Sequence, residues 1–148
     1  DNVKTIEQNA FSGCSDLQFV TWGNNITDIQ DRAFYGCTSL RFIILGDYVE
    51  TIGAYAFYGA SSINISTLRV TLPASVKSIG DYAFRNVEFV YCKSLTPPFL
   101  GGANVFGNDW GTSWKCKYYV PMSAVDDYKK APYWKDLGDN IVGYDFTE

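Results

Sequence analysis

The sequence contains no histidine, so it lacks the side chain most often used as a general base and as a transition-metal ligand. It also lacks a glycine-rich phosphate loop, a Gly-x-Ser-x-Gly elbow and a Ser-x-x-Lys pair. The adjacent carboxylates Asp126 and Asp127 fall on a segment that we expect to be an exposed helix. We therefore expect no enzymatic activity, no catalytic residue, no metal site and no cofactor.

Clustered positive charge and long apolar runs are also missing. Acidic residues outnumber basic ones by 16 to 12, and the longest basic cluster is the pair Lys129-Lys130. Because binding to phosphates needs a basic surface, we expect no nucleic-acid partner. No run reaches the roughly 18 apolar residues of a transmembrane helix, so we expect no membrane insertion of this part of the chain. A hydrophobic content of 47% is enough for a packed core, which argues against disorder.

A tandem repeat is the clearest positive feature. The dipeptide Ala-Phe recurs at intervals of 23, 23 and 27 residues, with its alanines at Ala10, Ala33, Ala56 and Ala83. Four residues before each alanine lies an isoleucine: Ile6, Ile29, Ile52 and Ile79. Two residues after each phenylalanine lies a small turn-forming residue: Gly13, Gly36, Gly59 and Asn86. Columns that recur together at one spacing predict stacked structural units.

Each column has a physical interpretation. The Gly/Asn column predicts a positive φ, which glycine adopts freely and asparagine tolerates. Asp31 and Asp81 lie two residues before alanine, where we expect a carboxylate to cap the start of a short helical turn. The phenylalanines are expected to fill the repeat core: Phe11, Phe34, Phe57 and Phe84.

An extended segment follows each turn. Leu17, Val20 and Trp22 recur one repeat later as Leu40, Ile43 and Leu45, and residues 69–72 continue the alternation. A period of two predicts strands, and an insertion around 61–66 accounts for the longer third interval. Such units bury their apolar sides only by stacking. The predicted fold class is α/β, a solenoid with one parallel β-sheet and short helical turns opposite.

The run Ile29–Leu40, IQDRAFYGCTSL, resembles the BspA-like leucine-rich repeats of bacterial, Bacteroidetes-type surface proteins. The resemblance covers residues 1–108, which we divide into about four repeats of about 23 residues, the last one degenerate. It implies a non-catalytic binding module of a cell-surface or secreted protein, with a concave sheet for adhesion to a host or neighbouring-cell protein. Since the chain starts inside a repeat, we expect it to be a piece of a longer protein.

The C-terminal residues 109–148 are predicted to cap the open end of the solenoid. Val105-Phe106, with Asn108 two beyond, continues the repeat as a degenerate fifth turn. A last strand over 116–120 ends at Pro121, and Ser123 is expected to cap a helix through about Ala131. Trp134, Leu137 and Ile141 are then expected to pack on the open end, as in the closing segments of the resembling proteins.

Two outward columns of the sheet are the candidate partner-binding surface. One reads Phe19, Phe42, Arg69 and Tyr91, and the next reads Thr21, Ile44 and Thr71. Exposed aromatic residues are typical of contact hot spots. In the alternative interpretation, neighbouring residues or other parts of a longer protein cover these rings. A glycan partner is a second hypothesis, based on Trp110, Trp114 and the eleven tyrosines, and a structural spacer is a third.

The four cysteines leave alternatives open. Cys14 and Cys37 share a column with Ala60, which favours a small buried apolar position over a disulfide between coils. Cys92 and Cys116 lie near the C-terminal segment as a second candidate bridge. No close cysteine pair suggests zinc.

Overall fold

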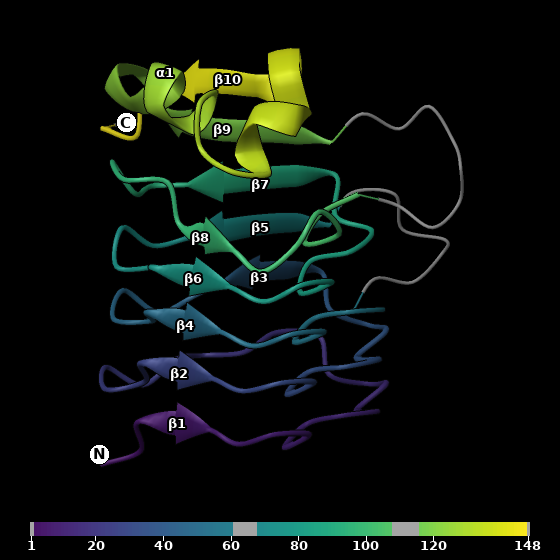
Figure 1. The fold of residues 1–148 in the computed structure, drawn as a ribbon. Helices are drawn as coiled ribbons and strands as arrows, with labels where there is room; N and C mark the ends of the chain where they lie inside the picture. The colour runs from purple at the N-terminus through teal and green to yellow at the C-terminus, as the bar shows by residue number, and fades with distance from the viewer. Residues whose placement is uncertain (1, 61–67, 108–115, 148) are drawn as a thin grey trace.

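The computed structural model describes residues 2–60, 68–107 and 116–147. The chain winds into coils stacked one above another, and strands of successive coils lie side by side up the stack (Figure 1). This arrangement confirms the predicted solenoid. The expected insertion at 61–66 and Asn108 lie outside the described residues.

The strands of the described residues form two parallel sheets, and not the single sheet expected from sequence. The first sheet consists of two-residue strands: β1 (Thr5–Ile6), β2 (Asp28–Ile29), β4 (Thr51–Ile52), β6 (Ser78–Ile79) and β8 (Phe99–Leu100). The second consists of β3 (Phe42–Ile44), β5 (Arg69–Leu72), β7 (Phe89–Cys92), β9 (Lys117–Pro121) and β10 (Ile141–Tyr144). The prediction missed the first sheet because two residues are too few to display an alternating pattern.

The turns between the two sheets are not helical, which corrects the second part of the predicted fold class. The residue before each alanine has a left-handed backbone, with φ of 57° at Arg32, 58° at Tyr55 and 59° at Tyr82. A left-handed residue interrupts an α-helix, so the following N–H groups point to the neighbouring coil. The N–H of Phe34 donates to the Ala56 carbonyl at 2.8 Å, and that of Phe57 donates to Ala83 at 2.9 Å.

The positive φ predicted for the Gly/Asn column is confirmed, with values from 67° to 75° at Gly13, Gly36, Gly59 and Asn86. Contrary to the prediction, Asp31 and Asp81 do not cap a helical turn of their own coil but accept hydrogen bonds from the next coil. Asp31 Oδ1 accepts a hydrogen bond from the N–H of Ala54 at 2.8 Å, and Asp81 Oδ1 accepts one from Asn104 at 2.9 Å. Both carboxylates therefore tie their coil to the next one, because the left-handed turn directs its own N–H groups elsewhere.

The core between the sheets contains a column of stacked rings. Phe34, Phe57 and Phe84 are buried, with successive ring centroids 5.0 and 5.2 Å apart. Phe11 stacks on Phe34 at 5.0 Å but keeps 42% of its surface exposed, since it lies in the first coil. Phe106 continues the column beyond Phe84 at 6.3 Å.

The C-terminal segment packs on the last coil, above β7 and β9 in Figure 1. Trp134 is fully buried 5.4 Å from the Phe106 ring, and its Nε1 donates to the Pro98 carbonyl at 2.8 Å. Ile141 is buried, and Leu137 packs against the core.

The helical elements of the described residues all follow β9: η1 (Met122–Ala124), α1 (Val125–Tyr128) and η2 (Trp134–Asn140). The predicted cap by Ser123 is wrong, because Ser123 lies inside η1 and α1 begins with no side-chain cap. The single helix expected through Ala131 is likewise shorter, with α1 ending at Tyr128.

Candidate functional site

Phe42 and Arg69 of the first predicted column lie on the outward face of the second sheet, where they are paired across β3 and β5. Phe19 precedes Phe42 by one repeat, but the strand expected around Leu17 to Trp22 is absent, so the second sheet begins one coil later, at β3. Phe19 and Phe42 expose 62% and 48% of their surfaces, and Arg69 is also exposed. No described residue covers either phenylalanine ring completely.

The second column contains Ile44 and Thr71, which are paired across β3 and β5, and Thr21 is exposed one repeat before Ile44. Tyr91 belongs to this column and not to the first, because β7 pairs Tyr91 with Thr71. The residue that follows Arg69 in the first column is Phe89. Sequence reasoning misplaced Tyr91 by two residues, since the step from β5 to β7 is shorter than the preceding steps.

A hollow of about 400 Å³ lies beside β3, and its lining combines apolar side chains with Asn24 and Asp47. Its lining brings together three of the predicted residues, Thr21, Phe42 and Ile44, with Trp22 and Tyr48. Ile44 and Tyr48 expose 57% and 59% of their surfaces, so apolar area here remains in contact with water. The hollow therefore offers a place for an apolar side chain of another molecule.

The C-terminal half of the same face carries, around the predicted Tyr91, three aromatic rings that sequence reasoning missed: Phe89, Tyr119 and Tyr144. Tyr91 stacks on Tyr119 at 4.7 Å, and Tyr144 contacts both rings edge-on at 5.5 and 5.6 Å. Phe89 lies 6.5 Å from Tyr119. For Phe89 and Tyr119 the signal was available in the sequence, because aligning the buried residues Val70, Val90 and Tyr118 brings these two rings to one face.

Positive charge accompanies these rings. The Arg69 guanidinium lies 5.5 Å from the centre of the Phe89 ring, in a cation–π geometry. Desolvation raises the pKa of the Tyr91 hydroxyl, the nearby Tyr119 adds to the rise, and Arg69 opposes it. The face thus combines half-buried aromatic rings with a cation at its middle.

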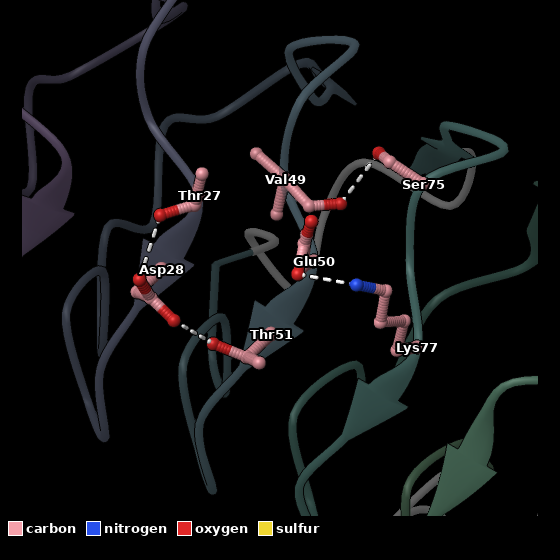
Figure 2. Close-up of polar contacts among 7 residues, drawn as sticks. All are labelled: Thr27, Asp28, Val49, Glu50, Thr51, Ser75 and Lys77. Atoms are coloured by element: carbon pink, nitrogen blue, oxygen red, sulfur yellow. Dashed lines mark hydrogen bonds and ion pairs between the residues drawn. The ribbon is translucent and has the colours of Figure 1, made fainter.

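The first sheet has a different, polar outward face (Figure 2). Asp28 accepts hydrogen bonds from Thr27 at 2.7 Å and from Thr51 at 2.5 Å, and both bonds lower the pKa of its carboxyl group. Lys77 pairs with Glu50 at 2.6 Å. A hollow of about 600 Å³ lies over this sheet, and Asp28 and Thr51 line it together with other polar residues: Thr5, Gln8, Gln30, Asp31 and Ser78.

The thiols do not form a second site. Cys14, Cys37, Cys92 and Cys116 are free, and the last three are buried. Burial raises the pKa of Cys37 to about 11 and that of Cys116 to about 12, so neither is a ready nucleophile. Among the described residues, no group of three or more potential metal ligands comes together.

The comparisons agree with the repeat architecture. Residues 1–95 match the model of a family described as the BspA type leucine-rich repeat region, in six copies. No curated protein matches the chain. In the part of the chain that the structure describes, no helix has the length and apolar character of a transmembrane span. Trp110 and Trp114, the basis of the glycan hypothesis, lie outside the described residues.

Proposed function

Because the chain belongs to the BspA-type leucine-rich repeat family, we propose that it is a non-catalytic protein-binding module that uses the outward face of its second sheet. The observation that carries this proposal is the exposed apolar surface around Phe42 and Ile44, beside the hollow of about 400 Å³. Burying such surface in a contact releases it from water and favours association.

The proposed setting is a bacterial cell surface or the extracellular space, where the module adheres to a protein of a host or a neighbouring cell. The support for this setting is the family, whose repeats resemble those of bacterial surface proteins. The proposed division is a repeat region over residues 1–108 and a segment over 109–148 that closes the stack. Burial of Trp134 against Phe106 supports the closing role.

A panel of purified extracellular-matrix proteins, immobilised and probed with the chain, tests the proposal. Phe42→Ser is expected to weaken binding at least tenfold, since a hot-spot aromatic residue contributes about 2 kcal/mol or more. Phe99→Ser is the matched control, because Phe99 is 66% exposed but lies on β8 of the other sheet. Equal binding by wild type and Phe42→Ser would refute the assigned surface, provided that both variants retain the wild-type melting temperature.

A glycan array run in parallel tests the alternative ligand class. Sugars stack on the open faces of aromatic rings, whereas Tyr91 and Tyr119 lie face to face with an interplanar angle of 15°. We therefore favour the protein ligand. Binding to glycans alone would reverse this preference, and empty results on both panels would favour a structural spacer.

A further inference from the structure

Arg69 occupies an unusual place on the second sheet. In the parallel register it lies between Phe42 on β3 and Phe89 on β7, in one outward column. Within residues 2–60, 68–107 and 116–147, Arg69 takes part in no ion pair. No carboxylate of the described chain therefore balances the charge of Arg69, and its guanidinium lies over the Phe89 ring.

Lys117 follows Phe89 in the same column. Its Nζ donates a hydrogen bond of 3.4 Å to Oδ1 of Asn140, a neutral partner that leaves the charge uncompensated. Lys93, just beyond β7, is also exposed. The strands β3, β5, β7, β9 and β10 contain no aspartate or glutamate, although the chain as a whole is acidic, with net charge −4.

We propose that this face binds an extended, acidic segment of a partner protein, with an apolar side chain in the hollow and carboxylates at Arg69 and Lys117. The inference rests on the proposed protein-binding function and adds the chemistry of the ligand. Charge complementarity supports it, because a carboxylate would compensate cations that the chain itself leaves unpaired. A basic segment would instead meet like charges.

The coil spacing sets the pattern of the ligand. Stacked core rings of adjacent coils lie 5.0 and 5.2 Å apart, so Phe42 and Lys117, three coils apart, are separated by about 15 Å at the roughly 4.8 Å spacing of neighbouring strands. An extended peptide advances about 3.3 Å per residue. Arg69 and Lys117 therefore lie about one and a half and about four and a half residues along a peptide that follows the column. Because alternate side chains of an extended peptide point to the same side, the carboxylates are expected two and four residues from the apolar residue that enters the hollow.

Selection from a display library of randomised ten-residue peptides tests this pattern. Wild-type protein is expected to enrich peptides in which Asp or Glu lies two or four residues from Leu, Ile or Phe. The double variant Arg69→Glu, Lys117→Glu is expected to enrich Lys and Arg at those positions instead. Selected peptides with the same charge composition for both proteins, or no enrichment by the wild type, would overturn the inference.

Titration of one enriched peptide, and of its Glu→Gln analogue, then isolates the charge. Arg69→Gln is expected to weaken binding of the acidic peptide up to about fivefold, the range of an exposed ion pair, and to leave the Gln analogue unaffected. Lys4→Gln removes the same charge beside β1 on the other sheet and is the matched control. If the Gln analogue binds the wild type as tightly as the acidic peptide, the acidic ligand is wrong. The proposed protein-binding function fails separately, when Phe42→Ser leaves binding to the matrix proteins unchanged.

Discussion

Truncation of a core ring should cost more in the middle of the phenylalanine column than in its first coil. Phe34 is fully buried and lies 5.0 Å from the rings of both Phe11 and Phe57, with Trp22 edge-on at 5.8 Å. Phe11 occupies the same repeat position, but among the described rings it stacks on Phe34 alone, and it is 42% exposed. The two sites therefore compare one substitution in two surroundings.

The expected magnitudes follow from burial. Replacing a buried phenylalanine by alanine costs about 3–5 kcal/mol, because the lost contacts leave a cavity that the neighbours fill only in part. Phe34→Ala should lie near the upper end of this range, since two stacked rings lose their partner. Phe11→Ala removes a ring that is already partly in water and should cost about 2 kcal/mol. A domain of this size has a total stability of about 5–15 kcal/mol, so Phe34→Ala removes a substantial fraction of it.

Urea denaturation followed by circular dichroism measures both costs. The midpoint should fall much further for Phe34→Ala than for Phe11→Ala, and the slopes should agree if both variants unfold as one unit. The reasoning would be refuted by equal losses, because equal losses mean that the first coil is as well packed as the second or that the rings do not form one column.

Three further outcomes are expected. Gly53→Ala should destabilise the fold strongly, since an added Cβ would overlap the Asp31 backbone nitrogen. Gly13→Ala should cost only about 1–2 kcal/mol for its left-handed backbone, because no atom lies within 4 Å of the added Cβ. Similar melting temperatures of the two variants would contradict this reasoning. The Thr51 hydroxyl holds the folded-state pKa of Asp28 below its unfolded value, so this hydrogen bond stabilises the fold only while the carboxylate is ionised. Thr51→Val should therefore lower the stability at neutral pH, and the difference from the wild type should shrink as the pH falls below about 4 and the carboxylate protonates. Trp134→Ala should lower the melting temperature as a core substitution of about 3–5 kcal/mol does, and an unchanged value would contradict the proposed closing role of residues 109–148.

The repeat columns predicted the stacking because each recurring residue type suits the backbone conformation or the core position that recurs in every coil. The Gly/Gly/Gly/Asn column predicted its positive φ, since these residue types tolerate it. The column Asn9, Arg32, Tyr55 and Tyr82 also has positive φ, but arginine and tyrosine do not favour that conformation, so nothing in these residues disclosed it. The helical turns were therefore predicted wrongly, and the hydrogen bonds between coils compensate for the strained backbone.

The candidate surface was predictable where the repeats are regular. Phe42 and Ile44 follow Phe19 and Thr21 at the common spacing of 23 residues, and all of these side chains are exposed or outward in the structure. Tyr91 was placed in the wrong column because the spacing changes after β5, and a change of two residues leaves a side chain on the same face but in another column. Tyr144 was missed because β10 follows helical segments that no repeat spacing describes.

The two outward faces differ in where their polar groups find partners, and this difference matters more than the size of the hollows. On the first sheet, Asp28 is bonded to Thr27 and Thr51, and Lys77 is paired with Glu50, so a ligand of these groups competes with bonds that already exist. On the second sheet, the water-exposed groups include Phe42, Ile44 and an arginine without a carboxylate in the described chain. Contact there releases apolar surface from water and supplies a missing counter-charge at no such cost. We therefore propose the hollow of about 400 Å³ on the second sheet as the binding site, although the one over the polar sheet, at about 600 Å³, is larger.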